Sequence, residues 1–131
     1  MGFDVRAGDG AVGKQVTPRF QPWQVWWADL DPIEGHEQGG RRPVLIVSSL
    51  FQLQLTRFSL ATVLPLTTRQ RPGWEHHRPL QLPGQPMSYV VTEQIRTLTS
   101  TRISGKAPLA VLAPQQIADI RPALAAMIDL A

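Results

Sequence analysis

The 131-residue chain contains no cysteine and no long apolar run. Without cysteine it can form neither disulfide bonds nor thiolate metal sites, which is typical of proteins in a reducing cytoplasm. No apolar run approaches the roughly 20 residues that span a bilayer. The N-terminus MGFDVRAGDGAVGK has no basic start followed by an apolar stretch. We therefore expect a cytoplasmic protein without a signal peptide and without a membrane partner.

The pattern of a helical bundle is also missing, because proline and glycine interrupt the chain too often. The chain has 12 prolines and 10 glycines, which favour short strands joined by many turns. Hydrophobic residues make up 43% of the sequence, which is enough for one core. The length fits a single domain.

Acidic residues are scarce in the middle of the chain. Residues 1–40 carry three basic and six acidic side chains, whereas residues 41–106 carry nine basic and two acidic ones. All but one of these nine are arginine, whose planar guanidinium matches phosphate and stacks on bases. This pattern predicts an anion-binding surface with RNA as its partner. The alternative is an ordinary solvated surface, as most charge runs are.

Apolar and β-branched runs predict six short strands, at residues 23–31, 43–48, 60–68, 78–82, 88–98 and 109–112. Pro65 indicates an edge or a bulge in the third strand. The segment SLFQLQLTRF fits a helical turn or a loop. Residues 1–20 lack periodicity and are predicted to form a flexible N-terminal extension. A twisted sheet of this size tends to curl into a small barrel, here formed by residues 21–131.

The C-terminal segment PQQIADIRPALAAMIDLA has the pattern of an amphipathic helix. Five apolar residues fall on one helical face: Ile117, Ile120, Leu124, Met127 and Ile128. Pro114 suits the first turn of a helix. Pro122 does not suit its interior, because it removes the hydrogen bond to the carbonyl of Ala118. We expect it to kink or split the helix.

Three motifs together resemble those of a known protein family. The segment WWADLDPIEGHEQGGRRPVLIVS resembles the opening of MazF/PemK-type toxins of bacterial toxin–antitoxin pairs. LPLTT resembles the family's apolar strand ending in L-T, and VVTEQIRTL resembles its E-Q-I-R-T strand. The motifs occur in the family's order, ahead of the expected terminal helix. The resemblance covers roughly residues 22–130.

The resemblance implies a fold, an activity and partners. The fold is mainly β with a C-terminal helix: a small SH3-like barrel of the CcdB/MazF/PemK type, forming a homodimer. The activity is sequence-specific, metal-independent cleavage of single-stranded RNA by an endoribonuclease toxin, an mRNA interferase. The partner is a cognate MazE-like antitoxin, and no cofactor is implied.

RNA is cleaved when its 2′-hydroxyl attacks the adjacent phosphorus. An enzyme then has to accept the hydroxyl proton and stabilise the charge that develops on phosphorus. The resemblance assigns catalysis to Arg42 and Thr67. Arg42 is expected to stabilise the charge and to protonate the leaving oxygen, and Thr67 to orient a phosphate oxygen. Thr68 replaces Thr67 if the alignment shifts by one residue.

The proton acceptor has two candidates, Glu37 and His36. Glu37 matches a family position tied to activity in some members. His36 stands where the family usually has serine, and a histidine titrates near neutral pH. A loop histidine is otherwise often only solvated, so both assignments stay open.

Further residues are predicted to bind RNA rather than to react. Trp74 is a candidate for stacking on a base, and the Gln94 amide can both donate to a base and accept from it. The full set is Gln38, Gly39, Gly40, Arg41, Thr68, Arg69, Trp74, Gln94 and Arg96. We expect no metal site, because adjacent residues such as His76 and His77 point to opposite faces of a strand.

Two other functions share the expected barrel. One is a CcdB-like toxin that targets DNA gyrase, and the other is a non-catalytic barrel that binds RNA or protein. The RRP and EQIRT motifs count against the gyrase-targeting toxin, and the non-catalytic barrel stays open.

Overall fold

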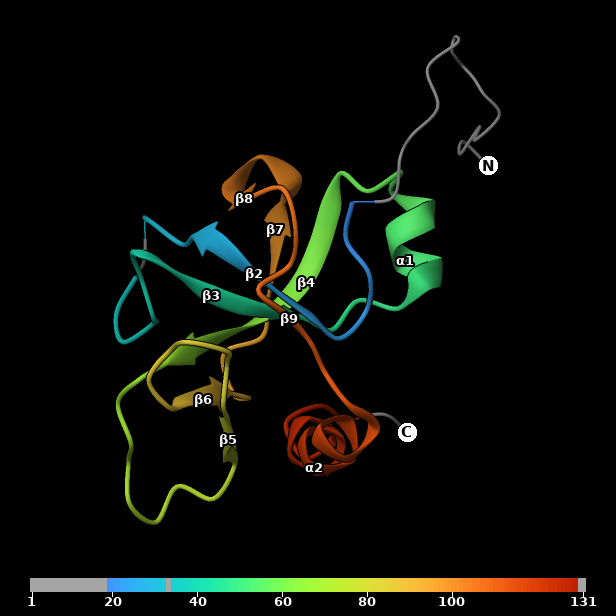
Figure 1. Cartoon of the computed structure of the whole chain (residues 1–131). Coiled ribbons are helices and arrows are strands. Elements are labelled where there is room, and N and C mark those ends of the chain that lie inside the picture. The colour runs from blue at the N-terminus through green and yellow to red at the C-terminus, as the bar shows by residue number, and fades with distance from the viewer. Residues whose placement is uncertain (1–18, 33, 130–131) are drawn as a thin grey trace, which may run out of the picture.

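The computed structural model describes residues 19–32 and 34–129 and places eight strands in one antiparallel sheet (Figure 1). The strands are β2 (Gln24–Asp29), β3 (Arg41–Ile46), β4 (Leu60–Thr67), β5 (His77–Leu80), β6 (Ser88–Val91), β7 (Arg96–Thr99), β8 (Ile103–Ser104) and β9 (Ala110–Val111). The main order is β5-β6-β4-β3-β2-β8, with β7 paired to β4 and β9 to β2. The expected fold class, mainly β with a C-terminal helix, is confirmed.

Two helices and one 3-10 turn complete these elements. They are α1 (Leu50–Leu55), η1 (Ser100–Arg102) and α2 (Pro114–Ala125). The ambiguous segment after β3 is therefore helical, and the side chain of Ser49 caps α1 by accepting from the amide of Gln52. Figure 1 shows α2 beside β5, with α1 at the other end of the sheet. Within the described residues, no helix is long and apolar enough to cross a membrane.

The central strands are buried on both faces. In β3, Val44 and Ile46 pack in one core cluster and Leu45 packs in the other. Successive side chains of a strand point to opposite faces, so this alternation places one cluster on each side of the sheet. Leu53 of α1 belongs to the first cluster and Ile120 of α2 to the second. Double burial explains why residues 44–46 of β3 and residues 63–66 of β4 are continuous apolar runs.

The predicted strand at residues 88–98 is wrong, because the structure divides it into β6 and β7. β6 pairs with Leu66–Thr67 of β4, whereas β7 pairs with Leu60–Val63 of the same strand. Pro65 lies between these two pairings and has no amide hydrogen to continue a ladder. Residues 92–95 form a turn where β4 changes its partner. Glu93 and Gln94 thus lie in this turn.

The predicted break at Pro122 is also wrong, because α2 continues through it. Pro122 stands close to the C-terminal end of the helix, so few hydrogen bonds follow it. Ala118, whose carbonyl loses its partner, is exposed and can be solvated. The helix ends at Ala125, so Met127 and Ile128 lie beyond the helical face that was predicted for them.

Arg19 and Phe20, which were predicted to belong to the N-terminal extension, pack against the domain. Phe20 is fully buried and meets Trp26 edge-on, with 5.4 Å between the ring centroids. Arg19 donates a hydrogen bond to the carbonyl of Ile103 at 2.6 Å. Both residues therefore belong to the packed domain. Residues 1–18 lie outside the described part of the chain.

Candidate functional site

Arg42 and Thr67 are neighbours on adjacent strands. The register of β3 and β4 pairs Val44 with Pro65, and continuing it by two residues places Arg42 opposite Thr67. Side chains at opposite positions of an antiparallel pair share one face. The Arg42 guanidinium also donates to the carbonyl of Leu66 at 3.0 Å. The guanidinium of Arg42 therefore lies at the end of β4 that carries Thr67.

The loop between β2 and β3 holds Arg42 from its other side. Nε of Arg42 donates to the carbonyl of Gly39 at 2.8 Å. Gly40 has a φ of 73°, a left-handed conformation that favours glycine. Its amide donates to Oδ1 of Asp31 at 2.8 Å, and its carbonyl accepts from the amide of Leu30 at 2.9 Å. The glycines thus turn the backbone onto the guanidinium.

Burial changes the electrostatics of Arg42. Loss of solvent lowers the pKa of Arg42 from its usual value, and the negative charge of Asp31 partly offsets this effect. The side chain remains a cation at neutral pH, and its guanidinium keeps N–H donors beyond the two that bind Gly39 and Leu66. A partly desolvated cation of this kind gains from an arriving phosphate.

Gln94 fastens the β6–β7 turn to the same loop. Its Oε1 accepts from the amide of Gln38 at 2.7 Å, and its Nε2 lies 3.4 Å from the carbonyl of His36. The amide predicted to read a base therefore binds the loop backbone. This arrangement suits a positioning role for Gln94, because it sets the loop that carries His36 and Gln38.

A pocket of about 290 Å³ opens beside this loop. It is lined by His36, Gln38, Arg71, Trp74, His77, Glu93 and Gln94. Trp74 is 41% exposed, and the guanidinium of Arg71 lies 4.7 Å from its ring centroid. An exposed indole beside a cation can stack on a base and bind its phosphate. A second pocket of similar size shares Arg71, Trp74 and His77 with the first.

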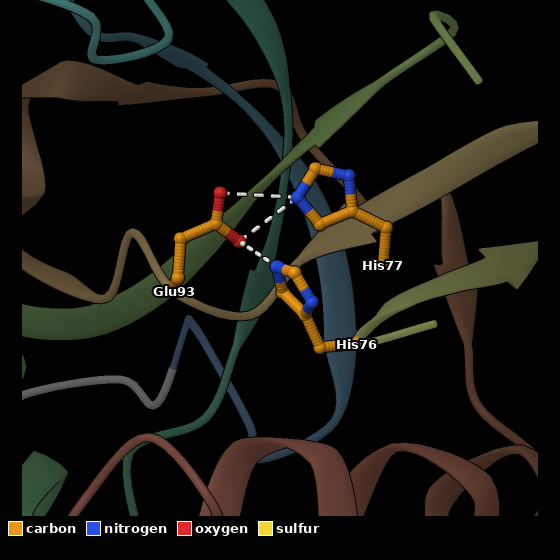
Figure 2. Close-up of side chains that lie close together, drawn as sticks. All are labelled: His76, His77 and Glu93. Atoms are coloured by element: carbon orange, nitrogen blue, oxygen red, sulfur yellow. Dashed lines mark hydrogen bonds and ion pairs between the residues drawn. The ribbon is translucent and has the colours of Figure 1, made fainter. Parts of the chain in front are cut away.

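His76, His77 and Glu93 converge at one point (Figure 2). Nε2 of His77 lies 2.8 Å and 3.0 Å from the two carboxylate oxygens of Glu93, and Nε2 of His76 lies 3.4 Å from the nearer one. The prediction that the two histidines point to opposite faces is wrong. His76 precedes β5, so the alternation of a strand does not apply to it.

The structure keeps other predicted residues apart from this pocket. The guanidinium of Arg41 lies 4.6 Å from the ring centroid of Trp27 and donates to Ser104, at the side of β3 away from β4. Arg96 donates to the carbonyl of Leu30 at 3.4 Å. Glu37 is exposed and accepts from the amide of Glu34 at 3.0 Å. These contacts occupy each side chain locally.

Thr68 and Arg69 follow Thr67 directly at the end of β4. Both are exposed, and the amide of Arg69 donates to Oγ1 of Thr67 at 3.1 Å. This bond fixes the rotamer of the Thr67 hydroxyl.

Arg71 and His77 were not among the predicted site residues. The sequence offers one indication of Arg71, because it is one of the basic residues that make residues 41–106 a predicted anion-binding surface. The pairing of His77 with Glu93 joins residues 16 positions apart. No periodicity in the sequence predicts this contact, because the contact depends on β5 and β6 forming a hairpin.

Comparison with known proteins identifies relatives of this chain. The family described as PemK-like, MazF-like toxins of type II toxin–antitoxin systems matches residues 21–128. Endoribonuclease PemK of Escherichia coli is 47% identical over 69 residues, and this match spans half of each protein. Endoribonuclease EndoA of Bacillus subtilis (strain 168) is 30% identical over 87 residues, which cover 63% of this chain and 72% of EndoA.

Solved structures agree on the fold. MazF of Deinococcus radiodurans superposes with a TM-score of 0.70 at 26% identity, covering 85% of this chain and 97% of that protein. A MazE–MazF structure from the same organism gives a TM-score of 0.62 at 27% identity, covering 85% and 96%. The expected MazF-type barrel is confirmed by these likenesses.

Proposed function

Because the chain belongs to the family of PemK-like, MazF-like toxins of type II toxin–antitoxin systems, we propose that it is an endoribonuclease toxin. PemK of Escherichia coli and EndoA of Bacillus subtilis are both named for that activity. We propose that the chain cleaves single-stranded RNA at specific sequences, as an mRNA interferase, and that cleavage needs no metal ion.

One observation carries this proposal: the guanidinium of Arg42 binds the carbonyl of Leu66, the residue before Thr67, and the carbonyl of Gly39 in the loop at residues 34–40. The attacking 2′-oxygen forms a new bond to phosphorus while the bond to the 5′-oxygen breaks. Arg42 stabilises the extra negative charge and protonates the leaving 5′-oxygen. Thr67 binds a non-bridging phosphate oxygen. A partly desolvated arginine held by two hydrogen bonds is preorganised for this task.

The proton of the 2′-hydroxyl needs an acceptor near Arg42. His36 lines the pocket, whereas the carboxylate of Glu37 accepts from the amide of Glu34. We therefore assign the base to His36. Trp74 and Gln38 line the same pocket and bind the nucleotides next to the scissile phosphate.

Partners and location follow from the family. The related MazF of Deinococcus radiodurans has been crystallised together with MazE. We propose a MazE-like antitoxin for this chain, a homodimer as its assembly and the cytoplasm as its location. A gyrase-targeting toxin is the second candidate, but a protein target gives no reason to hold a desolvated arginine beside a threonine hydroxyl.

The decisive assay compares variants on a long single-stranded RNA in the presence of EDTA. We expect discrete cuts with the native chain and a loss of at least about 100-fold in rate with Arg42→Ala, because the developing charge loses its partner. Arg121→Ala is the matched control. Arg121 lies on α2 with its guanidinium 5.5 Å from the Trp23 ring centroid, so its loss should leave the rate unchanged.

Two results would count against the proposal. One is RNA of several sequences left intact by the native chain at high concentration. The other is equal cleavage by the native chain and by Arg42→Ala. Thermal melting of each variant shows whether a lost activity reflects a lost fold.

A further inference from the structure

We propose that His76, His77 and Glu93 form a binding site for a divalent transition-metal ion of the zinc class. The side chains come from the start of β5 and from the β6–β7 turn, and their donor atoms all lie within 4.8 Å of one another. Figure 2 shows both imidazole rings directing Nε2 at the same carboxylate. Two imidazole nitrogens and a carboxylate are a ligand set that zinc takes in proteins.

One of the separations fits a tetrahedral ion as it stands, and another has to widen. Bonds of about 2.0–2.2 Å at tetrahedral angles place two ligand atoms about 3.4 Å apart. Nε2 of His76 already lies 3.4 Å from Oε1 of Glu93. Nε2 of His77 lies 2.8 Å from the same oxygen, a hydrogen-bond distance that has to widen by about half an ångström to admit an ion. A rotation of the Glu93 side chain supplies this.

The surroundings hold the ligands in place before an ion arrives. Only 3% of the His77 side chain is exposed, so its ring is fixed in the fold. Trp74 stacks against His76 with 5.2 Å between ring centroids and meets His77 at 5.1 Å. The hydroxyl of Thr92 donates to the carbonyl of His76 at 2.7 Å and so joins the two segments that carry the ligands.

The tautomer of His77 has to change when an ion binds at Nε2. Its Nδ1 is buried and has no hydrogen-bond partner within the described part of the chain. Among the described residues, therefore, only Glu93 holds the proton on Nε2. An ion that replaces that hydrogen bond needs the lone pair of Nε2, so the proton has to move to Nδ1, where no described residue accepts it.

The fourth coordination position of the ion can be reached from the pocket. His77 and Glu93 line the pocket of about 290 Å³, and the side chain of His76 is 32% exposed. A water molecule from the pocket can complete the coordination. A bound ion would link the segment at residues 76–77 to the turn at residues 92–95. This inference does not depend on nuclease activity.

Metal binding can be measured directly on the full chain without a histidine tag. We expect one Zn²⁺ per chain in calorimetric titration, a change in tryptophan fluorescence because Trp74 adjoins both imidazoles, and visible absorption bands of tetrahedral Co²⁺. Glu93→Gln and His76→Ala should each weaken the affinity by at least about tenfold, since loss of a ligand costs no less than loss of its supporting contacts.

Glu75→Gln is the matched control for Glu93→Gln. Glu75 is an exposed carboxylate one residue from His76 and lies outside the cluster, so its substitution should leave zinc affinity unchanged. The proposal is overturned if the native chain binds no zinc, or if Glu93→Gln and His76→Ala bind it as tightly as the native chain. Circular dichroism of each variant confirms that the fold is kept.

Discussion

His36 and Glu37 are adjacent, yet only His36 lines the pocket, because the carboxylate of Glu37 is held by the amide of Glu34. We expect His36→Ala to lower kcat by about 100-fold, the lower range for loss of a general base. Glu37→Ala should have a smaller effect. Single-turnover cleavage rates of both variants test this assignment, and a larger loss with Glu37→Ala would reverse it.

At the scale of elements, α2 is attached to the sheet by one ion pair and one apolar contact surface. Arg78 of β5 binds Asp119 at 2.7 Å and 3.0 Å, and these hydrogen bonds raise the pKa of Arg78. The pair is solvated, so Asp119→Ala should cost at most about 1 kcal/mol. Ile120 is buried in the second core cluster, and Ile120→Ala should cost about 2–5 kcal/mol. Urea unfolding measures both, and equal losses would mean that the ion pair holds the helix.

Across the whole molecule, the basic middle of the chain gathers Arg42, Arg69 and Arg71 around the site. Each phosphate contact to a single strand contributes about −0.7 to the slope of log affinity against log salt. Three contacts therefore predict a slope of about −2. Binding of 2′-O-methyl RNA, which has no attacking hydroxyl, measures this without cleavage. Arg71→Ala should reduce the slope by about 0.7, whereas a native slope near zero would show that phosphates are not bound there.

Much of the site and of the fold could be predicted from residues close together in the sequence. Arg42 and Thr67 each belong to a short motif next to an apolar strand, and the alternation of β3 between the two core clusters follows from its apolar run. The split of residues 88–98 into two strands could not be predicted in this way. It depends on β4 changing its partner next to Pro65, which is a property of the paired sheet.

The sequence by itself determined most of the strands, the terminal helix and the two residues proposed for catalysis, because local periodicity and short motifs encode them. Only the tertiary structure decided which side chains share the pocket. Gln94 binds Gln38, which is 56 residues away in the sequence. Glu93 contacts two adjacent histidines, whose side chains would point apart if both lay on one strand. Such contacts arise when distant segments pack together. Their geometry is set by the pairing of strands and by the positions of turns, which no single segment specifies.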